Sequence, residues 1–162
     1  MAFSIRSFRP TDLEPIIEIT VAAWQPIFAS TREIVGEELF EIVHADPNAR
    51  KREQVSKACQ ADDPRQVWIA ESDSEIVGFI TVNMDHDRKV AEIGNNAVSP
   101  AHHHKGIGAR MYEFVLGQMK QAGMKAAIVT TGGDEAHAPA RSAYEKVGFS
   151  GPVPSVEYHI NF

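Results

Sequence analysis

The stretch that most constrains this chain runs from Val98 to Ala109 and reads Val-Ser-Pro-Ala-His-His-His-Lys-Gly-Ile-Gly-Ala. An apolar strand pattern leads into it, and an amphipathic helix pattern leads out of it. Gly106 and Gly108 allow a ligand to approach the backbone closely, because glycine has no Cβ. A helix that begins there directs its unpaired N–H groups and the positive end of its dipole out of the loop. The stretch therefore predicts a phosphate-binding turn, with an ordinary strand-to-helix turn as the alternative.

Length and charge exclude several classes of protein. A chain of 162 residues is long enough for one domain with a buried core, so we predict a single domain over residues 1–162. The formal net charge of −6 argues against binding to bulk nucleic acid. We expect no membrane span, since no run of about 18 apolar residues occurs, and no signal peptide at the N-terminus. The single cysteine, Cys59, excludes an internal disulfide and predicts a reducing cytoplasm; its helical context predicts an inert thiol.

Hydrophobic periodicity divides the chain into alternating elements. Strands are predicted at residues 3–8, 67–71, 75–85, 89–98, 124–131 and 153–162, the last of which completes the sheet. Helices are predicted at about 11–24, 32–44, 47–61, from the central loop to Gly123, and 139–147. Pro26 is expected to end the first helix. The three strands between 67 and 98 predict an antiparallel meander, whereas the strand, helix and strand from 89 to 131 predict a βαβ unit with parallel strands.

Three local motifs occur in order along the chain. They are Ile5-Arg6-x-x-Arg9-x-x-Asp12-Leu13, then Val98-x-Pro100 with Gly106-Ile107-Gly108, and Ala140-x-x-Ala143-Tyr144-Glu145-Lys146-Val147-Gly148-Phe149. Together with the order of elements, they resemble the GNAT fold of acetyl-CoA-dependent N-acetyltransferases over essentially the whole chain. The resemblance implies an α+β fold with a mixed, mostly antiparallel, seven-stranded twisted sheet flanked by helices. A central βαβ unit would bind acetyl-CoA.

The resemblance also implies which residues bind acetyl-CoA, the cosubstrate. They are Asn96, Ala97, Val98, His103, His104, Lys105, Gly106, Ile107, Gly108, Ala109 and His137. Three of these depart from the family pattern. His103 stands where Arg or Gln is usual, His104 where glycine is common, and His137 where Asn is often found. Because a neutral imidazole supplies less charge to a pyrophosphate, we expect the affinity for the cofactor to be modest or pH-dependent.

Acetyl transfer to an amine needs a proton donor for the departing thiolate and a group that accepts a proton from the amine. The resemblance assigns the donor to Tyr144, with a packed core tyrosine as the alternative. Glu92 is the candidate base, since it lies fourteen residues before Gly106, where some family members carry a catalytic carboxylate. The alternative is a carboxylate that faces solvent or pairs with Lys89. The turn residues 85–87 are weaker candidates.

The three adjacent histidines do not predict a metal site, because neighbouring side chains on an extended or turning backbone do not all converge on one ion. Trp24 and Phe28 are predicted to form one wall of the acceptor site, although aromatics at this spacing also serve as core. The predicted acceptor is an amine of a small molecule or a peptide, with a slight lean toward a cationic one. We predict no nucleic-acid or membrane partner and leave a homodimer open. The alternative function is a noncatalytic GNAT-like module that binds acyl-CoA as a sensor.

Overall fold

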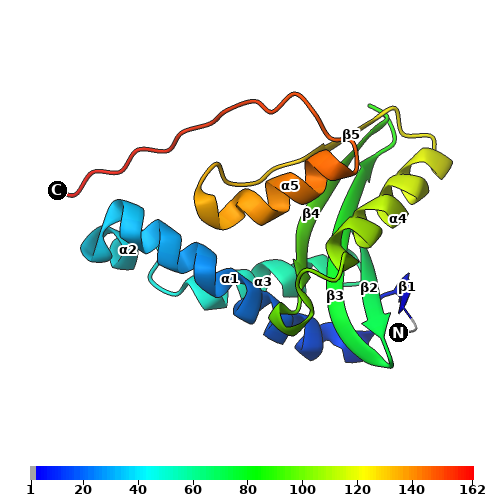
Figure 1. The fold of residues 1–162 in the computed structure, drawn as a ribbon, viewed down its shortest axis with the longest axis horizontal. Helices are drawn as coiled ribbons and strands as arrows, with labels where there is room; N and C mark the ends of the chain where they lie inside the picture. The colour runs from blue at the N-terminus through cyan, green and yellow to red at the C-terminus, as the bar shows by residue number, and fades with distance from the viewer. Residues whose placement is uncertain (1–2) are drawn as a thin grey trace.

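In the computed structural model, which describes residues 3–162, a five-stranded sheet forms the centre of the described chain (Figure 1). Its strands are β1 (Phe3–Ser7), β2 (Gln66–Ser72), β3 (Glu75–Asp85), β4 (Val90–Val98) and β5 (Ala126–Val129), in that order across the sheet. The first three pairings are antiparallel, and β4 pairs with β5 in parallel. These pairings confirm the mixed sheet, the meander and the βαβ unit. Met1 and Ala2, the start of the predicted domain and of the segment expected to lack a signal peptide, lie outside the described residues.

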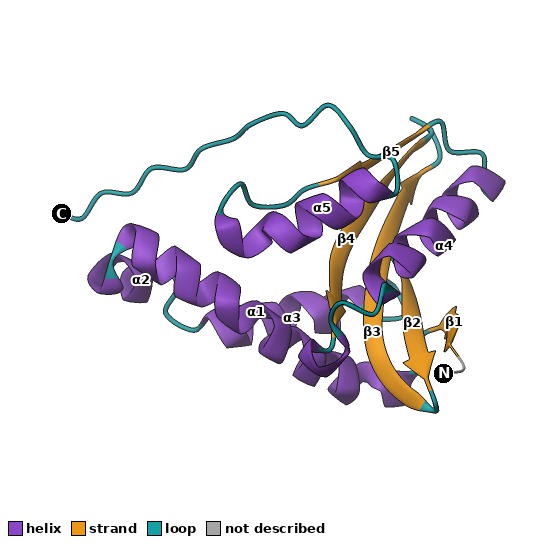
Figure 2. Ribbon diagram, viewed as in Figure 1, coloured by secondary structure: helices purple, strands orange, loops and turns teal. Residues whose placement is uncertain are grey.

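Helices cover both faces of the sheet (Figure 2). They are α1 (Leu13–Val35), α2 (Glu37–Val43), α3 (Pro47–Ala58), α4 (Ile107–Gln121) and α5 (Ala138–Lys146). On one face, Ile16 of α1 and Val55 of α3 pack on Phe79 of β3. On the other face, Met111 of α4 and Tyr144 of α5 share a core with residues of β3 and β4. A strand residue that belongs to one of these two cores therefore has its side chain on the corresponding face of the sheet. Among residues 3–162, no helix is both long and apolar enough to cross a bilayer.

The first helix is longer than predicted, because Pro26 lies inside α1 and does not end it. Proline removes a single N–H donor, and this helix continues through Val35 with packed neighbours on either side of the proline. The helix ends instead at Gly36, whose φ of 85° is a backbone conformation that suits glycine. The prediction of a second helix from residue 32 was therefore wrong at its start, since α2 begins at Glu37.

The predicted seven-stranded sheet and the predicted last strand, 153–162, are wrong for the described chain, in which no strand follows β5. The segment alternates apolar and polar residues, but a strand also needs a partner edge. Residues 150–162 turn away from β5 and run back toward α2 (Figure 1), where Asn161 Nδ2 donates to Glu38 Oε1 at 2.8 Å. Because this segment has no partner strand, its apolar side chains are exposed, among them Val153 and Tyr158.

The first of the three motifs has a structural role at the junction of β1 and α1. Arg6 donates to both carboxylate oxygens of Asp12, at 2.7 and 3.0 Å, and to Glu71 Oε1 at 2.6 Å. The backbone N–H of Arg9 also donates to Asp12 Oδ2, at 2.7 Å. Asp12 is 4% exposed, and its hydrogen bond with Arg6 lowers its pKa although burial acts in the opposite direction. The motif thus fixes the edge strand to the first helix.

Asp12→Asn is expected to lower the free energy of unfolding by about 3 kcal/mol at pH 7, because it leaves the partly buried Arg6 with one carboxylate fewer. A carboxylate with a lowered folded-state pKa stabilises the fold above its unfolded pKa, and this contribution disappears as the pH falls through the folded-state value. Urea unfolding should therefore show a difference between wild type and variant that shrinks as the pH is lowered below about 4. An equal difference at pH 7 and pH 2.5 would contradict the electrostatic origin.

Candidate active site

Strands β4 and β5 separate at the place where the cofactor was predicted. They pair only from Val90 to Ile93 on β4, so residues 94–98 have β3 on one side and no strand on the other. A register shift in the β3–β4 ladder places one extra residue on β4 between Ile93 and Asn96. Gly94 lies in this bulge, where a Cβ would be 2.7 Å from Thr81 Oγ1. The bulge leaves the backbone of residues 96–98 accessible for hydrogen bonds to an extended ligand, as the resemblance implied.

The loop after β4 prepares the start of α4. Ser99 N donates to Val77 O at 2.8 Å, and a short 3₁₀ turn follows at Pro100–His102. His104 and Gly106 have φ values of 61° and 74°, so the chain passes twice through the left-handed region before the helix begins. Both residues are exposed, and the sequence supplies glycine at only one of the two positions.

The N-terminus of α4 presents free N–H groups. Its first helical hydrogen bond runs from Arg110 N to Gly106 O at 3.1 Å, so the N–H groups of residues 107–109 precede the helical ladder. The N-cap residue is Gly106, which has no side chain to cap them, and the first turn contains no acidic residue. Gly108 has room for a Cβ, with Tyr112 and Val98 as its nearest neighbours at 3.9 Å. Uncapped N–H groups at the positive end of a helix dipole are suited to bind an anion. A turn with a purely structural role does not require them.

The three histidines of the loop behave differently from one another. His103 Nε2 lies 3.0 Å from Val98 O and donates a hydrogen bond that braces the loop, which leaves its Nδ1 for a ligand. His104 packs edge-on against His103, with ring centroids 6.2 Å apart, and Lys105 is exposed. His102 approaches Glu75 instead. In the described part of the chain, no three His, Cys, Asp or Glu side chains group in a way that could hold a metal ion.

Tyr144 lies on α5 at the end of a hydrogen-bonded chain of side chains. Its ring packs against Tyr112 and Phe149, with centroids 4.8 and 5.9 Å away. Tyr112 Oη donates to Asn96 Oδ1 at 2.8 Å, and Asn96 Nδ2 donates to Tyr144 Oη at 3.3 Å. Because the Tyr144 oxygen accepts a hydrogen bond here, its own proton stays available for another acceptor. Burial raises the pKa of Tyr112, and the adjacent Tyr144 raises it further, so Tyr112 remains a neutral donor.

Tyr112 is a site residue that the sequence did not identify. It occupies a buried position of an amphipathic helix, and that pattern is typical of core. The side chain of Asn96 was also missed, since only the backbone of this residue was expected to matter. The signal available in the sequence was a polar amide two residues beyond the glycine of the bulge, in a strand that contains the buried residues Ala91, Ile93 and Ala97.

Glu92 is not brought together with Tyr144. Its neighbours on β4, Ala91 and Ile93, belong to the core that contains Tyr144, so strand alternation places Glu92 on the opposite face. The side chain is exposed, and within residues 3–162 it makes neither a hydrogen bond nor an ion pair, including with Lys89. A role in proton transfer would therefore require a chain of waters.

Trp24 and Phe28, the predicted acceptor wall, meet the loop before α5. The two rings are 5.9 Å apart on α1, and Trp24 packs edge-on against His137 at 6.1 Å. Lys51 of α3 places its Nζ 3.3 Å from the centroid of the Trp24 ring. Burial lowers the pKa of Lys51 to about 8, with a smaller contribution from Arg50. This surface therefore already accommodates an amino group on an aromatic face.

His137 ends a 3₁₀ turn (Glu135–His137) and is held from one side. Its Nδ1 is hydrogen-bonded to Asp134 Oδ1, and Ser30 Oγ of α1 donates to Asp134 Oδ2 at 2.9 Å. Burial alone would raise the pKa of Asp134, but the hydrogen bonds from His137 and Ser30 lower it below its usual value. Asp134 is therefore a carboxylate at neutral pH. The sequence predicted His137 but neither Asp134 nor Ser30, because their contact joins residues 104 positions apart.

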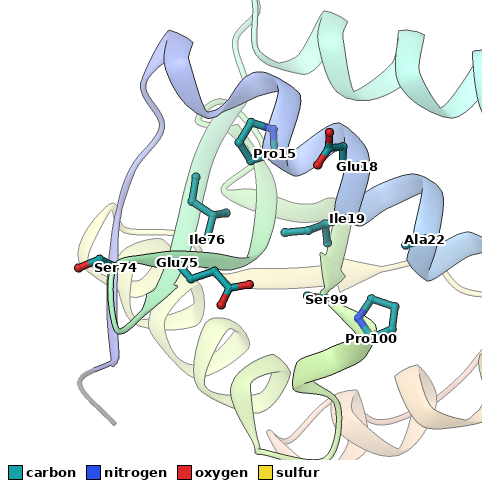
Figure 3. A pocket seen from close by; sticks show the side chains of 9 residues that line it. All are labelled: Pro15, Glu18, Ile19, Ala22, Ser74, Glu75, Ile76, Ser99 and Pro100. Carbon is teal, nitrogen blue, oxygen red and sulfur yellow. The ribbon is translucent and has the colours of Figure 1, made fainter.

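Two other features lie apart from this site. A pocket of 540 Å³ opens between α1 and the β2–β3 turn, with Ser99 and Pro100 on its far side (Figure 3). The pocket is lined by none of the predicted site residues, and its only titratable lining side chains are Glu18 and Glu75. Cys59 is half-buried at the C-cap of α3, and burial raises the pKa of its thiol to about 11, as expected for an inert cysteine.

Known proteins share this fold. The chain is 23% identical to PaiA N-acetyltransferase from Thermoplasma acidophilum, whose structure was solved in complex with coenzyme A; the match covers 93% of this chain and 91% of that one, with a TM-score of 0.70. It is 18% identical to the ribosomal-protein-S18-alanine N-acetyltransferase from Escherichia coli, over 94% and 80% of the two chains, with a TM-score of 0.69. Identities this low show the fold alone.

Sequence comparison adds a relative and a family. An uncharacterized N-acetyltransferase in the lysA 3′ region of Bacillus methanolicus is 29% identical over 73 residues, which are 45% of this chain and 60% of that protein. The match therefore spans less than two thirds of that relative. The profile of the acetyltransferase (GNAT) family matches residues 28–149, a range that includes the splayed strands, the uncapped helix and the Tyr144 motif. By this match, the chain belongs to the acetyltransferase (GNAT) family.

Proposed function

We propose that the protein transfers the acetyl group of acetyl-CoA directly to a primary amine of a small molecule or a peptide. The observation that carries the proposal is the hydrogen-bonded chain Tyr112–Asn96–Tyr144. It holds the Tyr144 hydroxyl, with its proton free, next to the part of β4 that does not pair with β5. The coenzyme A bound to PaiA and the alanine N-acetylation by the Escherichia coli relative support the same class of reaction.

The residues present fit coenzyme A in two places. The uncapped N–H groups of residues 107–109 would hold the pyrophosphate, since nothing of the chain itself occupies them. The backbone of residues 96–98 would extend the sheet to the pantetheine arm. Bound acetyl-CoA supplies an activated thioester whose carbonyl carbon an amine can attack. His103, His104, Lys105 and His137 remain proposed contacts to the cofactor.

Tyr144 is the proposed proton donor. The thiolate that leaves the thioester needs a proton, and the Tyr144 hydroxyl can donate one because its oxygen already accepts a hydrogen bond from Asn96 Nδ2. Asn96 is in turn oriented by Tyr112, so the hydroxyl is held in one direction before the ligand binds. Trp24 and Phe28 are the proposed acceptor wall.

Glu92 remains the sequence-based proposal for the base, acting through water. If it is the base, Glu92→Gln lowers turnover by about 10²-fold or more while CoA affinity is unchanged, because only the proton acceptor is removed. Glu113→Gln, an exposed glutamate on α4, is the matched control. Thiol release measured with both variants decides the point, and turnover equal to that of wild type for Glu92→Gln assigns the proton to another group.

The function is tested in two steps. Thermal unfolding with acetyl-CoA, CoA and ATP shows whether the protein binds coenzyme A and distinguishes this from general nucleotide binding. Thiol release is then followed with spermidine, an alanine-terminated tetrapeptide and neamine as acceptors. Stabilisation by acetyl-CoA together with amine-dependent thiol release is the expected result. Absence of release with every amine would contradict the transferase proposal.

A noncatalytic acyl-CoA sensor is the second candidate, and the bracing of His103 on Val98 O favours it. A side chain that holds its own loop contributes less to a pyrophosphate than a free Arg would. Acetyl-CoA binding with no amine-dependent thiol release is the outcome that this candidate predicts. The single domain, a homodimer, cytoplasmic localisation, and the absence of metal, nucleic-acid and membrane partners remain predictions from the sequence.

A further inference from the structure

Asp134, His137 and Ser30 form a hydrogen-bonded group outside the Tyr144 chain. Asp134 accepts from His137 Nδ1 on one carboxylate oxygen and from Ser30 Oγ on the other, at 2.9 Å. Arg141 Nη1 fixes the loop by donating to the carbonyl oxygens of Gly132 and Asp134 at 2.7 and 2.6 Å. Gly132 leaves the necessary space, since a Cβ there would lie 2.6 Å from Asp134 Oδ1 and against the His137 ring. The backbone and three side chains thus hold one imidazole in one orientation.

This orientation determines which nitrogen of His137 is available. A carboxylate accepts hydrogen bonds only, so the proton of the neutral imidazole is on Nδ1 and the lone pair is on Nε2. Both side chains are partly accessible, at 17% for His137 and 22% for Asp134. Trp24 of the proposed acceptor wall packs edge-on against the ring. An oriented imidazole with a free lone pair beside an acceptor surface has the features of a general base.

We infer that His137 Nε2 accepts a proton from the acceptor amine, with Asp134 and Ser30 as positioning residues; this inference rests on the proposed function. Spacing along the chain agrees with it. His137 is the N-cap residue of α5, and Tyr144 lies seven residues further on, which corresponds to a rise of about 10 Å between their Cα positions. Tyr144 Oη to sulfur, sulfur to the attacking nitrogen, and nitrogen to His137 Nε2 are each about 3 Å, which together make about 9 Å. Glu92, on the opposite face, has no such relation to Tyr144.

The proton transfers balance. The acceptor arrives as an ammonium and gives one proton to His137 Nε2, which later releases it to solvent. The neutral nitrogen attacks the acetyl carbonyl carbon, so that the N–C bond forms, the C–S bond breaks, and its electron pair stays on sulfur. Tyr144 gives its proton to that sulfur, and the remaining excess proton on nitrogen restores Tyr144. The products are the N-acetylated amine, CoA thiol and one proton.

His137→Gln is expected to lower kcat by about 10²-fold with whichever of spermidine, the alanine-terminated tetrapeptide or neamine the wild type acetylates. The KM for acetyl-CoA and the stabilisation by CoA should stay within about twofold, because the Tyr144 chain and the helix N-terminus are unchanged, whereas the sequence-based role of His137 as a contact to the cofactor predicts that both are impaired. Asp134→Asn should lower kcat by about 10-fold or more, because the imidazole of His137 is then no longer held with its proton on Nδ1. His159→Gln, on the last segment of the chain and outside the predicted site, is the control and should behave as wild type.

Chemical rescue separates a base from a structural residue. Added imidazole should raise the kcat of His137→Ala by at least about 10-fold, since a free imidazole supplies the same lone pair. No rescue, or a loss of CoA-induced stabilisation in place of kcat, would overturn the inference and leave His137 as a contact to the cofactor. Wild-type kcat in His137→Gln beside a loss in Glu92→Gln would assign the base to Glu92. A wild type that binds acetyl-CoA but acetylates no amine would overturn the proposed function itself, and the inference with it.

Discussion

Gly108→Ala is expected to abolish the stabilisation of the protein by CoA while the fold stays intact. A Cβ at this position would lie 3.9 Å from Tyr112 and from Val98, an ordinary contact distance, so the protein tolerates it. The added methyl group would project toward the end of β4, where the ligand must approach the N–H groups of α4. At a CoA concentration about 100-fold above Kd, wild type should gain about 2.7 kcal/mol, or roughly 5–10 °C in Tm. The variant should gain none.

Gly117→Ala is the matched control on the same helix. A Cβ at Gly117 meets no atom within 4 Å, and alanine in a helix interior stabilises by about 0.5–1 kcal/mol. This variant should therefore show an unchanged or higher Tm and the full response to CoA. Gly106→Val should also lose the response, but its φ of 74° strains any β-branched residue, so it tests the loop less cleanly. Full CoA-induced stabilisation of Gly108→Ala would place the pyrophosphate elsewhere.

Elements that are determined by residues close together in the sequence were predictable, and elements that depend on a distant partner were not. The meander and the βαβ unit followed from short turns and periodicity, and the structure confirms both. Pro26 suggested a helix end because proline opposes helix in isolation, whereas packing of α1 against α2 and α3 retains the helix. Residues 153–162 carry the alternation of a strand, and nothing local could show that β5 would be only four residues long and unpaired on its outer edge.

The same distinction holds within the candidate site. Gly106, Gly108 and Tyr144 lie in motifs that are contiguous in sequence, and the structure places them on the helix N-terminus and on α5, as expected. Asn96 and Tyr112 meet across 16 residues, and Ser30 and Asp134 across 104. No periodicity encodes such contacts, because each side chain alone looks like an ordinary core or loop residue. Polar contacts between residues this far apart in the sequence are seen only in the three-dimensional structure.

Tyr144→Phe is expected to lower turnover by about 10²-fold with folding and CoA binding intact. Phenylalanine preserves the ring that packs on Tyr112 and Phe149 and removes only the hydroxyl. The cost to stability is one hydrogen bond from Asn96 Nδ2, about 1 kcal/mol. Tyr158→Phe is the control, since Tyr158, the third tyrosine of the chain, is 90% exposed on the last segment. Thiol release and thermal unfolding with CoA measure the two effects separately.

Tyr112→Phe distinguishes a directed proton donor from a hydroxyl that merely lies near the ligand. This variant keeps the Tyr144 proton but frees Asn96 Oδ1, so the amide that orients Tyr144 loses its own anchor. If orientation matters, turnover should fall by about 10-fold, between wild type and Tyr144→Phe, because misalignment of a donor weakens proton transfer without abolishing it. If Tyr144 only packs, both variants should turn over at the wild-type rate, and Tyr144 would have no part in the chemistry. A loss in Tyr112→Phe alone would instead make Tyr112 the donor.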